Sequence, residues 1–288
     1  MIDDERGAPP WRRASSVYLA LLLALVGAAV LLLQHRDATA GKPAGQPGPG
    51  QQLLTIAPAQ PVTGVARAAR LPATLATTFA RLSAAPPDPF PSHATTGLVV
   101  HPAGPIALYT APGGGAAFAT LPTTQLGSPT WVPVVAARPG WAQVLLPSRP
   151  GHGTGWIVVT RQLQVARSPY LVDVDLARHR LTLVRNGRPV GSWPVAIGAP
   201  ATPTPIGRTY LMASVTPATP TYSPLILPLA THSDTLDRYG GGPGTVALHS
   251  WPDPRVFGHS VSHGCVRVPA PALALLRSIP LGTLVLIH

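Results

Sequence analysis

The sequence predicts a mainly β protein with one short helix, in which two folded domains follow a hydrophobic N-terminal segment. Three observations lead to this prediction. The 288 residues include 37 prolines and 28 glycines, and proline in a helix interior breaks the helix, which argues against a mostly helical fold. Short β-type runs alternate with turn residues in the second half of the chain. Apolar residues make up 45% of the chain, enough to bury a core.

The charge of the chain is strongly basic but scattered. There are 21 basic residues against 10 acidic ones, which gives a net charge of +11. Arginines such as Arg67, Arg138, Arg180 and Arg255 do not gather on one predicted face with aromatic side chains beside them, as they would in a nucleic-acid binder. We therefore expect no nucleic-acid partner. Attraction to an anionic polymer of the cell envelope is compatible with the charge.

The N-terminal segment predicts export. Residues 14–33 carry no charge and number about twenty, the length that spans a bilayer. Arg12 and Arg13 precede them, so the positive-inside rule leaves residues 1–13 in the cytoplasm. We expect a single-pass membrane anchor with the rest of the chain extracytoplasmic. The alternative is a cleaved signal peptide with an A-x-A-like site at residues 38–40, which would make the protein secreted.

A linker and a small β domain are expected next. Residues 34–96 are rich in proline and alanine, which predicts a stiff, mostly disordered spacer. Residues 97–162 contain short β-runs divided by turns, including GWAQVLLPSRPGHGTGWI, which resembles a bacterial SH3-like barrel with its two Gly-Trp strands. We expect Trp131, Trp141 and Trp156 to form part of its core.

A second β-rich domain is expected at residues 168–288. Asn186 and Gly187 lie between two alternating strands, the position that favours a type I′ hairpin turn. A strand, GTVALHS, brings His249 to its end, and GTLVLIH closes the chain. The one good helix is APALALLRSI, with Pro271 in its first turn.

Cys265 is the only cysteine of the chain and cannot form an internal disulfide. Cysteine catalysis needs a thiolate, a base or cation that stabilises it, and N–H groups for an oxyanion. His249, at a predicted strand end upstream, is the candidate base. Amides of His263, Gly264 and Cys265 could line an oxyanion pocket. Arg267 could bind an anionic group of a substrate.

Other interpretations of these residues remain open at this point. A lone cysteine can be a buried apolar side chain or an intermolecular link. Zinc is a further alternative, since His249, His259, His263 and Cys265 are suitable ligands. Against zinc, the stretch is a glycine-rich loop and no nearby acid is placed to act as a catalytic base. We therefore expect no metal.

The stretch around Cys265 also carries a family resemblance. LHSWPDPRVFGHSVSHGCVRV resembles the signature of the L,D-transpeptidase (YkuD-type) catalytic domain: a histidine, a spacer, then Ser-His-Gly-Cys, a hydrophobic residue and Arg or Asn. YLVDVDLARHRLTLVRNGRPVGSWPVAIG is similar to the opening strand and hairpin of the family, and ATPTPIGRTY to its Thr-Pro loop. The resemblance covers about residues 170–287 and implies a β-sandwich domain. The spacer between His249 and Ser262 is short for the family, which affects the expected lid shape and acceptor choice.

The resemblance implies a peptidoglycan L,D-transpeptidase, which builds cell wall cross-links. In this family the thiolate attacks the carbonyl between the third stem residue and the terminal D-Ala, D-Ala leaves, and an amine of a neighbouring stem resolves the thioester. Carried over, Cys265 is the nucleophile and His249 the general base and acid, its ring held by the carbonyl of Ser250. His263 and Gly264 would shape the oxyanion pocket.

The resemblance also implies which residues contact the substrate and which partners the protein has, and it leaves two alternative functions open. Arg267 fills the Arg/Asn position, and Tyr222 and Trp251 are weaker candidates for the substrate pocket. The expected partners are peptidoglycan stem peptides, the cell wall and, through the anchor, the membrane; carbapenem-type β-lactams are expected inhibitors, and no cofactor is needed. Two rival functions are an L,D-carboxypeptidase or cross-link hydrolase with the same residues, and a wall-binding protein with a vestigial catalytic domain. The presence of His249, Ser250 and Cys265 together counts against a vestigial catalytic domain.

Overall fold

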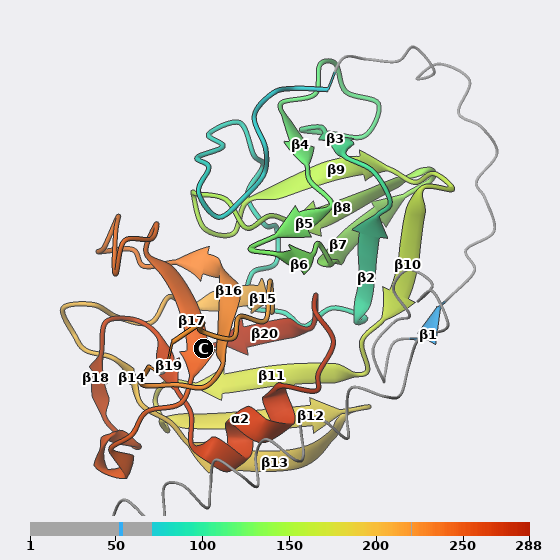
Figure 1. Ribbon diagram of the computed structural model, residues 1–288. Helices are drawn as coiled ribbons and strands as arrows, with labels where there is room; N and C mark the ends of the chain where they lie inside the picture. Colours follow the sequence, from blue (N-terminus) through green and yellow to red (C-terminus); the bar gives the residue numbers. More distant parts are fainter. Residues whose placement is uncertain (1–51, 54–70, 220) are drawn as a thin grey trace, which may run out of the picture. The chain divides into compact units, whose positions relative to one another are not determined.

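The computed structural model describes residues 52–53, 71–219 and 221–288 (Figure 1). The chain divides into two units, Met1–Gln46 and Pro47–His288, and the described residues all belong to the second. The predicted anchor at 14–33 lies outside the described residues, as does the linker up to residue 70 apart from residues 52–53. Among the residues that are described, none forms a helix long and apolar enough to cross a membrane.

The described part of the chain is mainly β, as predicted. Its one α-helix is α2 (Ala270–Leu276), accompanied by a short 3₁₀ helix, η2 (Pro254–Val256). Pro271 lies in the first turn of α2, where its missing N–H costs no helical hydrogen bond. The helix buries Ala272, Leu273 and Leu276 in the core of the C-terminal domain.

The N-terminal lobe, residues 71–167, is built on antiparallel strands. Its main sheet has the order β1-β10-β2-β7-β8-β9, and two short hairpins, β3-β4 and β5-β6, accompany it. The strands are β1 (Gln52–Leu53), β2 (Leu98–Pro102), β3 (Ile106–Leu108), β4 (Ala119–Leu121), β5 (Thr124–Gln125), β6 (Ser128–Pro129), β7 (Val132–Arg138), β8 (Trp141–Leu145), β9 (Thr154–Val158) and β10 (Leu163–Arg167). Trp131, Trp141 and Trp156 are all buried, which confirms their predicted place in the core.

Within the lobe, residues 71–96 pack against its strands, so the prediction of a disordered spacer does not hold for them. Ala76 and Leu82 belong to the hydrophobic core of the lobe. The amide of Ala76 donates to the carbonyl of Thr120, and that of Asp88 to the carbonyl of His152. Burial of Ala76 and Leu82 helps to anchor this proline-rich stretch, although Leu71, Leu75, Phe79 and Phe90 stay exposed.

The C-terminal domain, residues 168–288, contains a five-stranded sheet and two smaller ones. The large sheet has the order β13-β12-β11-β20-β15, in which β11 and β20 run parallel. Its strands are β11 (Tyr170–Asp175), β12 (Arg180–Arg185), β13 (Arg188–Pro194), β15 (Gly207–Tyr210) and β20 (Leu284–Ile287). The predicted hairpin between β12 and β13 is confirmed: Asn186 and Gly187 have φ values of 50° and 76°, as a type I′ turn requires.

The smaller sheets carry the segments of greatest chemical interest. One has the order β16-β17-β19, formed by β16 (Ile226–His232), β17 (Thr245–His249) and β19 (Val266–Arg267). The other pairs β14 (Ile197–Gly198) with β18 (Ser260–Ser262) in parallel. In Figure 1 these strands lie together, next to the sheet that contains β11 and β12.

The two folded parts share packing as well as polar contacts. Tyr210, Met212, Ala230 and Leu284 of the C-terminal domain belong to the same core cluster as residues of the N-terminal lobe. Arg208 on β15 also makes a two-pronged ion pair with Asp88, with N–O distances of 2.6 and 2.5 Å. The two side chains are only 3% and 0% exposed. The N-terminal lobe and the C-terminal domain are therefore joined by a shared hydrophobic core and a buried ion pair.

Candidate active site

The pairing of β17 with β19 brings together the chain segments that carry His249 and Cys265. These strands run parallel, with Leu248 opposite Val266 and His249 opposite Arg267. Leu248 and Val266 are fully buried in the core. Because side chains alternate along a strand, His249 and Arg267 project from the other face. Cys265 directly precedes β19, and the charge of Arg267 acts on its thiol.

The loop that presents Cys265 is held by side-chain hydroxyls. The Oγ of Ser262 accepts from the amide of Gly264 at 3.1 Å and donates to the carbonyl of Cys265 at 2.6 Å. Gly264 has a φ of 110°, a conformation that residues with a Cβ rarely adopt. Two threonines of the Thr-Pro loop complete the support: Thr202 donates to the carbonyl of Ser262 and Thr204 to that of Gly264.

The ring of His249 has a defined orientation. Its Nδ1 lies 2.8 Å from the carbonyl oxygen of Ser250. A carbonyl can only accept, so Nδ1 carries the proton and Nε2 keeps its lone pair. The amide of Ser250 donates in turn to the Oγ of Ser223 at 2.9 Å, and this hydroxyl donates to the carbonyl of Leu225 at 2.6 Å. A chain of hydrogen bonds therefore holds the backbone of Ser250, whose carbonyl orients the imidazole.

Burial favours the neutral forms of both reactive side chains. Burial lowers the pKa of His249, the hydrogen bond to Ser250 opposes this shift, and the charge of Arg267 adds to it. Burial raises the pKa of Cys265, while a hydrogen bond with the backbone of Ala247 and the charge of Arg267 oppose the increase. The neutral imidazole is thus a competent base, and the thiol must lose its proton when it reacts.

Aromatic rings and one arginine form a wall beside His249. The ring of Tyr222 meets the imidazole edge to face, with centroids 4.8 Å apart, and the ring of Trp251 lies 5.2 Å from that of Tyr222. The guanidinium of Arg267 stacks on Trp251 at 3.6 Å from the ring centroid. The three candidate substrate-binding residues therefore come together around the imidazole.

Tyr239 covers a further side of this region. Its ring lies 4.9 Å from that of His263, and its hydroxyl lies 3.2 Å from Nδ1 of the same histidine. Tyr239 also interacts electrostatically with Arg267 and Tyr222. The side chain of His263 is exposed and turned toward Tyr239, which leaves only the backbone of His263 for the proposed oxyanion pocket.

Residues 169–287 match the model of the YkuD L,D-transpeptidase catalytic domain. This domain belongs to that family. The match covers nearly all of the C-terminal domain and none of the N-terminal lobe, so the SH3-like nature of the lobe stays a prediction. A comparison with curated protein sequences finds no match.

Solved L,D-transpeptidases are similar to parts of the chain. One from Mycobacterium smegmatis is 16% identical, covers 55% of this chain and 99% of its own, and has a TM-score of 0.35. One from Mycobacterium tuberculosis H37Rv is 15% identical, with coverages of 48% and 73% and a TM-score of 0.35. The catalytic domain of an L,D-transpeptidase from E. faecium is 23% identical, with coverages of 41% and 96% and a TM-score of 0.33.

Sequence reasoning missed two residues of this L,D-transpeptidase domain. Ser223 is buried under Ser250, yet a serine between a tyrosine and a proline carries no local signal for such a role. Tyr239 precedes three glycines, a run that by itself is equally compatible with a flexible loop. In the structure Tyr239 and Gly242 exchange two backbone hydrogen bonds around a two-residue turn. Gly240 and Gly241 have φ values of 56° and 82°, which identifies a tight hairpin turn.

The zinc alternative finds no support in the L,D-transpeptidase domain. Within the described ranges, no group of three or more His, Cys, Asp or Glu side chains is placed to hold a metal ion. His259 is exposed, and its carbonyl accepts from the amide of Ile197. Nδ1 of His263 lies 3.2 Å from the hydroxyl of Tyr239.

Proposed function

We propose that the protein is a peptidoglycan L,D-transpeptidase that forms a thioester on Cys265. The observation that supports the proposal is the pairing of β17, which ends at His249, with β19, which begins directly after Cys265, together with the hydrogen bond from the buried His249 ring to Ser250. This arrangement occurs within a domain of the L,D-transpeptidase family. A nucleophile, a base and a group that orients the base are the parts that acyl transfer through cysteine needs.

In the proposed first half-reaction, Nε2 of His249 takes the proton from the thiol of Cys265 as the sulfur attacks the carbonyl of the third stem residue. The bond from this carbonyl carbon to the nitrogen of D-Ala then breaks. The imidazolium returns its proton to this nitrogen, and D-Ala leaves with a free amine. The stem remains as a thioester on Cys265.

In the second half-reaction, an amine of a neighbouring stem attacks the thioester and gives its proton to His249. The new amide bond forms as the carbon–sulfur bond breaks, and the proton returns to the sulfur of Cys265. If water attacks in place of the amine, the product is a shortened stem, as in an L,D-carboxypeptidase. Exclusion of water by the aromatic wall would favour the amine.

The oxyanion of each tetrahedral intermediate needs N–H donors from the loop around Cys265. The amide of Gly264 already donates to Ser262, so we assign this role to the amides of His263 and Cys265. Gly264 contributes its left-handed backbone, which sets the direction of its neighbours' amides. We assign to Arg267 the orientation of an anionic group of the stem, with Tyr222 and Trp251 as the apolar sides of the pocket.

This function places the C-terminal domain outside the cytoplasm, where peptidoglycan is built. We propose that residues 14–33 anchor the chain in the membrane, because they are uncharged and follow two arginines. Carbapenem-type β-lactams would acylate Cys265 by the same attack on a carbonyl.

The proposal is tested by incubating the full chain with a tetrapeptide stem and analysing the products by mass. A cross-linked dimer together with free D-Ala is the result we expect. Tripeptide without dimer would instead assign a carboxypeptidase. Product formed at the wild-type rate by Cys265→Ala would refute both.

A further inference from the structure

The loop that carries Tyr239 is attached to the N-terminal lobe. Residues 233–244 connect β16 to β17, and the tight turn at Gly240 and Gly241 lies near their middle. Most side chains between residues 234 and 242 are exposed. Hydrogen bonds within the loop join Ser233 to Gly244 and Tyr239 to Gly242. Its exposed middle has little apolar burial to fix its position, so contacts from other parts of the chain add to its support.

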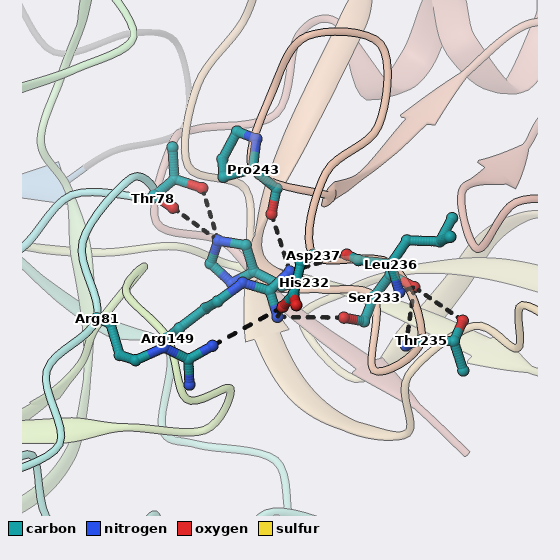
Figure 2. Close-up of polar contacts among 9 residues, drawn as sticks. All are labelled: Thr78, Arg81, Arg149, His232, Ser233, Thr235, Leu236, Asp237 and Pro243. Atoms are coloured by element: carbon teal, nitrogen blue, oxygen red, sulfur yellow. Dashed lines mark hydrogen bonds and ion pairs between the residues drawn. The ribbon is translucent and has the colours of Figure 1, made fainter.

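One arginine of the N-terminal lobe joins both arms of the loop. The guanidinium of Arg149 donates to the carbonyls of Ser233 at 3.3 Å, Leu236 at 3.0 Å and Pro243 at 2.9 Å (Figure 2). Ser233 and Pro243 lie near opposite ends of the loop. The side chain of Arg149 is only 16% exposed, and the Arg149 backbone is fixed by hydrogen bonds with Ala80 and Leu82.

A second contact holds the two strand ends from which the loop starts. Nε2 of His232, the last residue of β16, lies 2.8 Å from the carbonyl of Thr78 (Figure 2). The hydroxyl of Thr78 lies 2.6 Å from that of Thr245, the first residue of β17. His232 and Thr78 are both 2% exposed. The N-terminal lobe thus contacts the loop at its base and along both arms.

The far end of the same loop reaches the site around Cys265. Tyr239 contacts His263, which lies two residues before Cys265: their rings are 4.9 Å apart, and the Tyr239 hydroxyl lies 3.2 Å from Nδ1. Any shift of the loop arms therefore moves one side of the proposed substrate pocket.

We propose that Arg149 is a positioning residue for the active site: through three backbone carbonyls it holds the loop 233–244, so that Tyr239 lies against the Cys265 loop. The N-terminal lobe then has a part in the reaction without contacting the substrate. The kinetic test of this inference rests on the proposed function, whereas the exchange test does not.

The exchange test compares three full-chain variants by hydrogen–deuterium exchange of peptides that cover residues 233–244. Arg149→Ala removes the three hydrogen bonds and should speed exchange there about tenfold. Arg149→Lys keeps the charge but lacks the planar fork, so it should give an intermediate result. Arg81→Ala is the matched control: it removes one charge beside the same loop, where Arg81 lies 3.8 Å from Asp237 with both side chains largely exposed. The control should leave exchange unchanged.

The kinetic test uses a double-mutant cycle with Tyr239→Ala. Arg149→Ala alone should lower kcat/KM for the stem peptide on the order of tenfold, mainly through KM, because it displaces a side of the pocket. In the Tyr239→Ala background the same substitution should add less than about twofold, since both changes act through one loop. Arg81→Ala should leave both parameters within about twofold of wild type.

Two outcomes overturn the inference. One is unchanged exchange of residues 233–244 in Arg149→Ala, whatever the activity. The other is a full, additive loss of kcat/KM when Arg149→Ala is combined with Tyr239→Ala, because Arg149 would then act by another route. If the wild-type chain forms no product and its Cys265 takes up no acyl group, the proposed function fails, and the exchange result alone decides whether Arg149 supports the loop.

Discussion

Asp88→Ala should destabilise the whole protein, because it leaves the guanidinium of Arg208 buried without its partner. Asp88 lies in the proline-rich stretch before the N-terminal sheet, and Arg208 lies on β15 of the C-terminal domain. Two N–O contacts of 2.6 and 2.5 Å join them, and a third bond runs from Arg208 to the carbonyl of His93 at 3.0 Å. The pair therefore ties the predicted linker to the C-terminal domain.

The expected loss in unfolding free energy is about 3–5 kcal/mol, the usual cost of removing one partner of a buried ion pair. This is a large part of the roughly 5–15 kcal/mol that stabilises a typical folded protein. Replacing both residues by apolar ones, as in Asp88→Leu with Arg208→Met, should be far less harmful, because no uncompensated charge remains buried.

The assay is urea unfolding of the full chain followed by tryptophan fluorescence. The midpoint should fall in Asp88→Ala and recover in the double variant, with the denaturant slope unchanged. Arg178→Ala is the control: it removes the partner of an exposed ion pair with Asp175 and should have little measurable effect. A midpoint in Asp88→Ala equal to that of the control would refute the buried-pair reasoning.

Three further predictions concern the site itself. Ser223→Ala removes the acceptor of the Ser250 amide. Urea unfolding should show a loss of about 1–3 kcal/mol in stability, and assays of product formation should show a lower kcat. An unchanged kcat would contradict the idea that Ser223 supports His249 through Ser250. Burial places the pKa of His249 below its ordinary value of 6.5. As pH rises, kcat/KM should therefore increase with a midpoint below pH 6.5, as His249 loses its proton. A midpoint above 6.5 would show that another group titrates. Gly264→Ala forces a residue with a Cβ to adopt a φ of 110°. The substitution should lower the free energy of unfolding by about 1–3 kcal/mol and abolish product formation. Unchanged unfolding and activity would show that the loop tolerates a Cβ at this position.

The C-terminal fold could be predicted from sequence because its signals are local. Asn186 and Gly187 determine a turn within two residues, and Pro271 marks the start of the helix within one turn. His249 and Cys265 were found because a strand end and a distinctive loop lie close together in the sequence. These features depend on neighbours along the chain, which a single sequence displays.

The rest depends on contacts between distant residues. Thr78 meets His232 across 154 positions, and Asp88 meets Arg208 across 120. No local pattern predicts such pairs, so residues 71–96 were interpreted as a spacer. Tyr239 was missed for a related reason: a glycine run is compatible both with a flexible loop and with a tight turn, and only the two arms that approach each other decide between them.

The central claim is that Cys265 carries the acyl group. It is tested most directly by measuring the intact mass of the full chain, quenched in acid during turnover of a tetrapeptide stem, and by locating the added mass by peptide mapping. The account predicts an added tripeptide acyl group on Cys265, and none in Cys265→Ala, which should also form no product. Turnover by Cys265→Ala, or an acyl group on any other residue, would contradict it.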